Sequence, residues 1–329
     1  RRSKKGALLV VVALPACAGA DEAPPEAAAA PEPGVMTVAG FSESEAVRHD
    51  PVADIYLVAN INGDATEQDE KYSYDGLHRL IDFQRGVLSA DNTAILNANL
   101  EQDWDLDQTG NWNVFNQRIQ APLAQTRTHK LDNQIATINT WDDPEHDANG
   151  NMTFMPRGND PSLTFKAIYD AWNRLVRVED GASSAVVASY EHDGLNRRIV
   201  KRTTETRHYY YSDQWQVVEE DVEQSQRQEL ATAQYVWGLR YIDDLIVYDR
   251  IGEGQRLFGL QDANWNVVAL LDDAGAVQER YLYEPYGKVE FQDADFVSRP
   301  AGSALANPYT YTGRRLDDDT GLYYYRNRY

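Results

Sequence analysis

Carboxylates are the most abundant reactive side chains in this sequence, and three of them alternate at Asp103, Asp105 and Asp107. Alternating carboxylates open a calcium-binding loop, but such a loop also needs Gly at its sixth position and Glu at its twelfth. The sequence has Gln108 and Val114 at those positions. We therefore predict no calcium site in this stretch.

Two other kinds of chemistry also lack a clear set of residues. Acid–base hydrolysis needs two carboxylates at a fixed separation, and among 52 acidic residues no spacing singles out one pair. The six histidines are scattered, and none has another His or a Cys at the spacing of zinc ligands. We predict no catalytic residue, no metal and no cofactor, and we expect that the chain is not an enzyme.

The charge balance bears on the partners of the chain. Lys and Arg number 31 against 52 Asp and Glu, which gives a formal net charge of -21. The phosphate backbone of a nucleic acid would be repelled by such a chain. Nucleic acid is therefore not an expected partner.

A short motif recurs along the chain and predicts how its elements are arranged. An aromatic residue or His precedes Asp, small or polar residues follow, and Asn or Arg then leads into a branched apolar residue. The Asp residues of three copies, Asp147, Asp170 and Asp193, are 23 residues apart, which is a spacing typical of structural repeats. Asp can bond to its own backbone two residues on, and Gly or Asn accepts a positive φ, so each copy predicts a strand, a tight turn and a strand. The predicted turn residues are Tyr74, Asp75, Gly76, Asp147, Gly150, Tyr169, Asp170, Asp193, Gly194, Pro285, Tyr286 and Gly287.

Composition favours the same architecture. Twenty Tyr and 21 Gly stand beside only three Met and eight Phe, which favours strands and turns over helices. The polar stretch from Asp221 to Ala233 is expected to be a loop. We predict an all-β fold of serial β-hairpins.

The end of the chain carries the densest form of this pattern. The run YTGRRLDDDTGLYYYRNRY begins at Tyr311, and it follows YLYEPYGKVEF, which begins at Tyr281. It resembles the core segment associated with RHS repeats in the RHS/YD-repeat proteins, and the resemblance extends over residues 60–329. The residues that carry the signature are Thr312, Gly313, Arg314, Asp317, Thr320, Gly321, Leu322, Tyr323, Tyr324, Arg326, Arg328 and Tyr329.

This resemblance implies a role for the fold. In RHS/YD-repeat proteins, hairpins coil into a hollow β-shell, which encloses a C-terminal effector in bacterial toxins and serves as an extracellular scaffold in animal adhesion receptors. In the toxins, aspartates in the segment after the Arg-x-Arg-Tyr motif act in self-cleavage. The present sequence reaches that motif at Arg326, Arg328 and Tyr329, so no catalytic position is carried over. Asp317, Asp318 and Asp319 are expected to be solvated turn residues.

The N-terminal residues predict export. A basic start (RRSKK), an apolar run over residues 7–16 and the tetrapeptide LPAC resemble a bacterial lipoprotein signal, in which Cys17 would be lipidated and attach the chain to a membrane. The alternative is a poorly ordered leader in which Cys17 has no role. Cys17 is the single cysteine, so the fold holds without an intrachain disulfide.

These observations predict five segments and two possible roles. The segments are a leader at residues 1–20, an Ala/Pro/Glu-rich tether at 21–40, an entry segment at 41–70, a YD-repeat segment of the β-shell at 71–280 and the RHS core segment at 281–329. We expect a structural, encapsulating shell at the cell surface or outside the cell, the carrier part of a polymorphic toxin whose cargo is a C-terminal effector. The alternative is a surface adhesion module that binds glycans, with aromatic residues such as Trp215 and Trp265 stacked on sugars.

Overall fold

The computed structural model describes residues 47–50, 55–58, 67–91, 93–120, 122–139, 141–157, 160–224 and 228–329. The predicted leader with Cys17 and the predicted tether lie outside these residues. The chain forms two compact units, of which the first ends at Thr126 and the second begins at Arg127. This boundary falls inside the segment predicted to carry the repeats.

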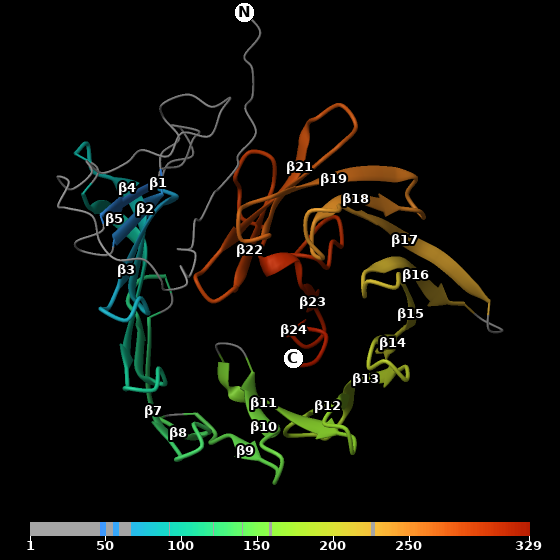
Figure 1. Cartoon of the computed structure of the whole chain (residues 1–329), viewed down its shortest axis with the longest axis horizontal. Helices are drawn as coiled ribbons and strands as arrows, with labels where there is room; N and C mark the ends of the chain where they lie inside the picture. The colour runs from blue at the N-terminus through green and yellow to red at the C-terminus, as the bar shows by residue number, and fades with distance from the viewer. Residues whose placement is uncertain are drawn as a thin grey trace, which may run out of the picture. The chain divides into compact units, whose positions relative to one another are not determined.

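Unit 1 is a meander of antiparallel strands in which each strand pairs with the next one in the chain (Figure 1). Its core is aromatic, because Phe83, Leu100 and Trp104 are buried and the rings of Trp112 and Phe115 pack against them. The unit boundary lies within the last of its strands. The strands are β1 (Val47–Asp50), β2 (Ile55–Val58), β3 (Asp69–Tyr74), β4 (Leu80–Leu88), β5 (Ile95–Leu106), β6 (Trp112–Gln117) and β7 (Leu123–His129).

Unit 2 contains a 14-stranded antiparallel sheet whose spatial order follows the chain order from β9 to β22. β8 (Ile135–Ile138) precedes it and pairs with β7. The strands of the sheet are β9 (Glu145–His146), β10 (Met152–Arg157), β11 (Asp160–Tyr169), β12 (Leu175–Asp180), β13 (Val186–His192), β14 (Arg198–Arg202), β15 (Thr206–Tyr211), β16 (Val217–Glu223), β17 (Glu229–Trp237), β18 (Leu245–Arg250), β19 (Gln255–Gln261), β20 (Val267–Leu271), β21 (Val277–Tyr283) and β22 (Val289–Gln292).

The last residues of unit 2 leave the sheet and fold back against it. A connection over residues 293–308 leads to a short 3-10 helix, η1 (Tyr311–Gly313), and a two-stranded hairpin of β23 (Arg315–Asp317) and β24 (Leu322–Tyr324). We call residues 309–329 the terminal segment. Within unit 2 the sheet curves around this segment, which lies on its concave side (Figure 1).

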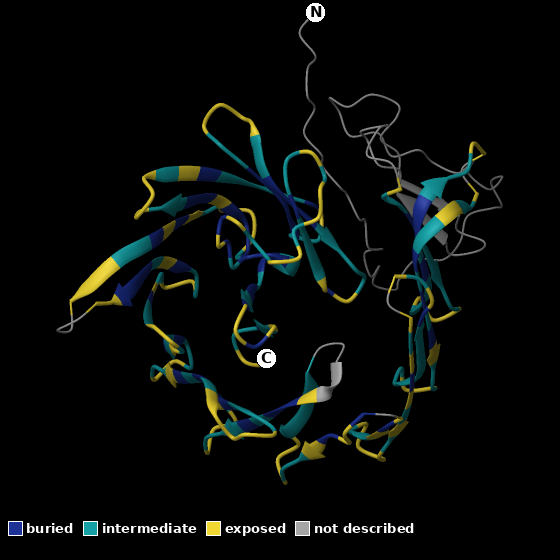
Figure 2. Ribbon diagram, turned by 180° about the vertical axis from the view of Figure 1, so that it is seen from behind, coloured by how far each residue is buried: buried dark blue, intermediate teal, exposed yellow. Residues whose placement is uncertain are grey.

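Two buried clusters join the terminal segment to the sheet. One contains Tyr209, Tyr235 and Tyr248 of the sheet together with Leu305 and Tyr309. The other is built from Phe165, Val178 and Tyr190, with Leu322 and Tyr329 packed on it. Figure 2 shows the buried residues along the strands and the exposed ones gathered at the hairpin ends.

The all-β prediction is confirmed, since the described residues form antiparallel strands and no α-helix. No helix among them is long and apolar enough to cross a membrane. The predicted loop from Asp221 to Ala233 is wrong over most of its length, because β16 and β17 extend into it and pair with register Val222↔Leu230. Strand pairing across the hairpin satisfies these polar residues' backbone groups, and it outweighs the local preference for a loop.

Candidate functional site

The repeat turns share one set of hydrogen bonds. In the best-defined copy, Asp193 Oδ1 accepts from the backbone N–H groups of Leu195 and Arg197, both at 2.9 Å, and its Oδ2 accepts from Arg197 Nε at 2.7 Å. Asp75, Asp147 and Asp170 make the same backbone bonds, with Arg79, Asn151 and Arg174 in the place of Arg197. Each Asp directly follows a strand, and Tyr74 and Tyr169 are the last residues of theirs.

The glycines of these turns have different roles. Gly150 has a positive φ of 87°. Gly76 and Gly194 do not, because the left-handed position is two residues further on, at His78 and Asn196. A second role of the Arg was not predicted from the sequence: Arg174 Nη1 donates to the carbonyl of Asp193 at 3.3 Å, and so joins one turn to the next.

The turn at Pro285, Tyr286 and Gly287 receives the terminal segment. It connects β21 and β22, and Gly287 closes it with φ 92° and an N–H bond to the Glu284 carbonyl at 2.9 Å. The hydroxyl of Tyr311 donates to the carbonyl of Pro285 at 2.8 Å, and that of Tyr323 donates to the carbonyl of Gly287 at 2.9 Å. Tyr286 itself is exposed.

A buried ion pair holds the terminal segment to β14. The guanidinium of Arg198 donates to both carboxylate oxygens of Asp317, at 2.5 and 3.0 Å, and each side chain is 1% exposed. Four tyrosine rings surround Arg198, with centroids 4.5–5.7 Å from its guanidinium carbon; they belong to Tyr190, Tyr209, Tyr324 and Tyr329. Burial alone would raise the pKa of Asp317, but the charges of Arg198 and Lys201 hold that pKa below its usual value.

The prediction that Asp317 is a solvated turn residue is therefore wrong. It is the last residue of β23, and the tight turn begins after it. The turn closes through Gly321, whose φ is 68° and whose N–H donates to the Asp317 carbonyl at 2.7 Å. Asp319 is exposed and forms an ion pair with Lys201 at 2.5 Å. Asp318 is also exposed, but the surrounding protein partly desolvates its carboxylate and raises its pKa, so the three aspartates have three different environments.

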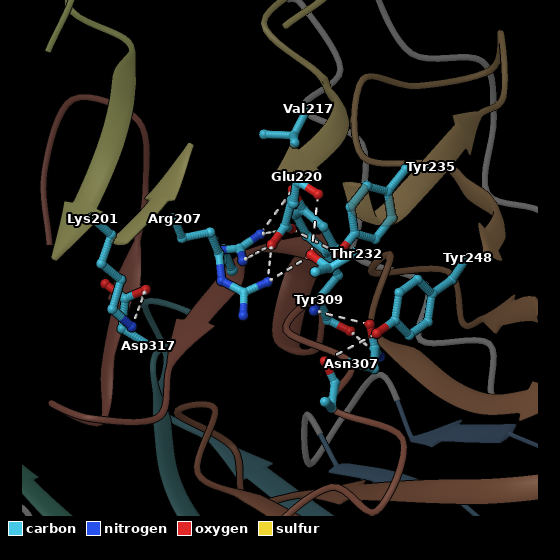
Figure 3. Close-up of polar contacts among 12 residues, drawn as sticks. Lys201, Arg207, Val217, Glu220, Thr232, Tyr235, Tyr248, Asn307, Tyr309 and Asp317 are labelled. Atoms are coloured by element: carbon cyan, nitrogen blue, oxygen red, sulfur yellow. Dashed lines mark hydrogen bonds and ion pairs between the residues drawn. The ribbon is translucent and has the colours of Figure 1, made fainter. Parts of the chain in front are cut away.

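A second buried pair lies two residues earlier in the terminal segment. Arg315 donates to Glu220 of β16 at 2.5 and 2.8 Å. Arg207 and the Tyr235 hydroxyl donate to the same carboxylate, at 3.1 and 2.7 Å (Figure 3). Burial would raise the pKa of Glu220, but Arg315 and Arg207 lower it to about 2. This carboxylate is therefore charged throughout the ordinary pH range.

A third carboxylate binds two arginines of the terminal segment. Asp243, between β17 and β18, lies 2.5 Å from Arg326 and 3.3 Å from Arg314. Gly313 packs directly on Asp243, since a Cβ added to this glycine would lie 2.6 Å from the Asp243 Cβ. Of the remaining signature residues, Thr312 adds a docking contact, because its N–H donates to Asn266. Two further contacts lie within the terminal segment itself: Thr320 Oγ1 accepts from Leu322 N, and the Arg328 guanidinium lies over the Tyr325 ring.

The connection before the terminal segment is fixed by a fourth buried carboxylate. Glu279 of β21 is fully buried and accepts hydrogen bonds from Ser303 Oγ and from the Ala304 N–H, each at 2.6 Å. The Tyr281 hydroxyl also donates to Glu279, at 2.7 Å. The connection is therefore ordered against the sheet.

Sequence reasoning missed Arg198, Glu220, Asp243 and Glu279. A signal for one of them is present, because Arg198 is a charged residue that shares the buried face of β14 with Val200. Among the described residues no group of three His, Cys, Asp or Glu is placed to hold a metal ion. Trp265 stacks on Tyr241 at 5.0 Å, so one face of this predicted sugar platform is already covered.

Comparisons with known proteins support the repeat assignment. No family model matches the chain. It is 26% identical over 199 residues to the tRNA3(Ser)-specific nuclease WapA of Bacillus spizizenii, and 26% identical over 200 residues to the tRNA nuclease WapA of Bacillus subtilis. Each match covers 60% of this chain and 8% of the WapA protein, so the chain spans a small part of these relatives.

Solved structures show the same fold. The structure of TcdB2-TccC3-Cdc42 matches with a TM-score of 0.60 and 17% identity, and that of TcdB2-TccC3 without its hypervariable C-terminal region matches with 0.56 and 16%. Each match covers 85% of this chain and 15% of the other. Together with the WapA relatives, these similarities support the resemblance to the RHS/YD-repeat proteins, and they identify the fold of unit 2 and unit 1 as that of serial β-hairpins.

Proposed function

We propose that this chain is the structural carrier part of an RHS-type toxin, a segment of a β-shell that encloses a C-terminal effector. The relatives support a carrier role in toxin systems, because WapA is named as a nuclease and the TcdB2-TccC3 structures have the same fold. The chain spans 8% of WapA, and nothing in the aligned part assigns the nuclease activity to it.

The observation that carries this proposal is the docking of the terminal segment on the concave side of the sheet. Three carboxylate sites, at Asp317, Glu220 and Asp243, hold it, and the first two of these carboxylates are 1% exposed. Such a segment is fixed inside the curve of the sheet rather than on its outer surface (Figure 1). A polypeptide joined to Tyr329 would therefore begin on the concave side of the sheet.

In this proposal the chain acts without catalysis. The buried carboxylates are engaged by arginines, which suits anchoring, whereas a catalytic acid or base needs a proton that it can exchange with a substrate. Export to the cell surface or beyond is part of the proposal, and it is based on the N-terminal sequence alone.

The test is the product encoded downstream of Tyr329. The carrier role predicts an effector there that is toxic when produced alone, and that resists protease when it is produced in one chain with residues 1–329. The matched control is the same chain with Arg198→Ala, in which the anchoring of Tyr329 is weakened and protection should fall. Equal digestion of the effector with and without residues 1–329 would contradict the carrier role. A glycan array with the purified chain tests the alternative, in which binding to immobilised sugars is expected.

A further inference from the structure

A cavity of about 380 Å³ lies in unit 2, between the end of the terminal segment and the strands β10 to β13. The terminal segment lies on the concave side of the sheet, and the cavity is therefore on this side as well (Figure 1). Its volume falls within the roughly 300–1,000 Å³ of cavities that bind small molecules. The cavity can therefore hold a small organic ligand.

The charged side chains around this cavity have one sign. Arg174, Arg326 and Arg328 line it, and no Asp or Glu is among the described residues of its lining. The chain as a whole has the opposite balance, with 52 acidic residues and a formal net charge of -21. The cavity is therefore a cationic region of an acidic protein.

Arg328 is the arginine of this lining whose charge is not balanced. Arg174 forms an ion pair with Asp170 at 2.6 Å, and Arg326 lies 2.5 Å from Asp243. Arg328 is exposed, and its guanidinium makes no ion pair or hydrogen bond with the described residues. A carboxylate in the cavity could pair with Arg328 and leave the two existing ion pairs intact.

Two side-chain amides of the lining offer further donors. The Asn173 oxygen accepts from the Nδ2 groups of Asn149 and Asn151, at 3.0 and 2.9 Å, and the Asn327 oxygen accepts from Asn196 Nδ2 at 3.1 Å. Since both oxygens are engaged, the Nδ2 groups of the exposed Asn173 and Asn327 remain as donors. Free donors suit an anion and not a cation.

His192 also lines the cavity, and its side chain makes no hydrogen bond with the described residues. Burial and the charges of Arg174 and Arg198 lower its pKa to about 4, against the opposing effect of Asp170 and Asp193. The imidazole is therefore uncharged at neutral pH. An anion beside it would raise its pKa, so that binding of the anion would take up a proton at mildly acidic pH.

The rest of the lining is mainly apolar. Met152 and Met155 of β10, Leu175 of β12 and Leu322 of β24 contribute side chains to it. Such side chains adapt to an aliphatic or aromatic body and gain dispersion contacts with it, which a bare inorganic anion does not offer. The cavity thus combines unpaired donors with an apolar surface.

We propose that this cavity binds a carboxylate on an apolar body, the chemistry shared by the C-terminal residue of a peptide and by a free organic acid. Arg328 pairs with the carboxylate, and the amides of Asn173 and Asn327 and the imidazole of His192 complete its surroundings. The apolar body packs on the Met and Leu side chains. The proposal stands on this cavity and does not depend on the carrier role.

The test uses residues 1–329 and five probes: N-acetyl-leucine and 4-methylpentanoate, each with its neutral amide, and acetate, which has no apolar body. In calorimetry or NMR titration at low salt, the carboxylate that binds more strongly should exceed its own amide at least about threefold, the factor expected for one partly exposed ion pair. Acetate should bind more weakly than this carboxylate. Stronger binding of N-acetyl-leucine than of 4-methylpentanoate would assign the site to peptide ends, and the reverse or equality to free acids; either result supports the site.

A substitution of Arg328 tests the ion pair. Arg328→Gln should remove the preference for the carboxylate over its amide, while the urea midpoint stays close to that of the parent, because Arg328 has no ion pair to lose. Arg256→Gln, at an exposed position of β19 outside the cavity, removes the same charge and is the matched control. It should bind as the parent does. Equal affinity for each carboxylate and its amide, acetate binding as strong as that of the larger acids, or an unchanged preference in Arg328→Gln would overturn the proposal.

The pH dependence supplies a second readout. Arg326 and Arg328 of the terminal segment line the cavity with His192, and these cations also oppose its protonation until an anion offsets them. N-acetyl-leucine stays ionised at pH 5, since the pKa of an α-carboxyl group is about 3.3–3.7. If the bound carboxylate raises the pKa of His192 by about one unit from its value of about 4, affinity should rise roughly twofold from pH 7 to pH 5. His192→Gln should abolish this rise; no rise in the parent, or the same rise in His192→Gln, would overturn the proposal.

Discussion

The Arg198 guanidinium and the Asp317 carboxylate meet in the interior of unit 2, 119 residues apart in sequence, and each side chain is 1% exposed. Their backbones belong to β14 and β23, so this one pair connects the sheet to the terminal segment. Two tyrosine hydroxyls add to the pair: Arg198 Nη1 donates to that of Tyr329 at 3.1 Å, and that of Tyr190 donates to Asp317 at 3.3 Å. A buried pair of this kind fixes which surfaces meet.

Removing one member of this pair should be more damaging than removing both. Arg198→Ala leaves Asp317 charged and buried, and should lower the free energy of unfolding by about 3–5 kcal/mol. Asp317→Leu combined with Arg198→Met removes both charges and should recover a large part of the loss. Urea unfolding followed by tyrosine and tryptophan fluorescence measures both.

The matched control for this experiment is Asp319→Asn. Asp319 is exposed, and among the described residues its ion pair is with Lys201, so the change in stability should stay within about 1 kcal/mol. A loss for Arg198→Ala no larger than that of Asp319→Asn would show that the buried pair does not hold the segment.

Acid should loosen the terminal segment through Glu220. The pKa of Glu220 is about 2 in the folded chain and near 4.5 in an unfolded one, so the unfolded chain binds more protons between these values. The stabilisation is complete above about pH 4.5 and is lost as the pH falls toward 2. The urea midpoint should fall over this window.

Other carboxylates titrate in the same range, and Asp75, whose pKa is also about 2, is one of them. The comparison with Glu220→Gln isolates the contribution of Glu220. This variant should be less stable at pH 7, because Arg315 loses its counter-charge, but its midpoint should depend less steeply on pH below 4.5. Parallel pH profiles of the two proteins would refute the assignment.

The repeat turns could be predicted from the sequence because all their bonding atoms lie close together in the chain. Asp193 bonds to Leu195 and Arg197, so the motif contains the whole interaction. The docking site could not be predicted in this way. Arg198 and Asp317, or Glu220 and Arg315, belong to strands far apart in sequence, and no local pattern says which charged residue pairs with which.

The same difference explains the error at Asp317. DDDTG has the composition of a solvated turn, and local composition alone places all three aspartates in water. Asp317 is buried because its side of β23 faces the sheet. β23 has three residues, which is too few for an alternation of apolar and polar residues to predict which side is buried. The resemblance to RHS/YD-repeat proteins singled out the terminal segment. It did not predict the buried contacts that this segment makes with the sheet.

Two glycine substitutions distinguish the strain of a left-handed backbone from a clash with the terminal segment. Gly287→Ala places a Cβ 2.6 Å from the Tyr311 ring at a φ of 92°, whereas Gly275→Ala meets no atom within 4 Å at a φ of 76°. Both should lose about 1–2 kcal/mol from the left-handed backbone. Gly287→Ala should lose about 1–3 kcal/mol more, because the Tyr311 ring must move away from the turn. Equal losses of stability in thermal or urea unfolding would show that the contact between the added Cβ and the Tyr311 ring does not affect stability.

A turn prediction tests the repeat motif. Asp193→Ala removes two bonds to backbone N–H groups and one to Arg197, and should lower the free energy of unfolding by about 1.5–4.5 kcal/mol, since each of the three bonds contributes roughly 0.5–1.5 kcal/mol. Asp213→Ala is the control in the next turn of the same sheet edge, where the Asp is exposed, and should change stability by less than about 0.5 kcal/mol. If the two substitutions lower the stability equally, the Asp of the motif does not stabilise the turn.

The last prediction is that residues 1–329 do not cleave their own C-terminal part. Cleavage by carboxylates needs two of them that share a proton beside the scissile bond. Asp317 forms an ion pair with Arg198, which keeps the pKa of Asp317 low, and Asp319 forms an ion pair with Lys201. Asp318, whose pKa is raised, therefore has two neighbouring carboxylates that are both held in ion pairs. Intact mass should therefore stay constant over days at pH 5 and pH 7. A fragment that ends within residues 293–329 in the parent, and that disappears in Asp318→Asn or Asp319→Asn, would show that this turn is catalytic.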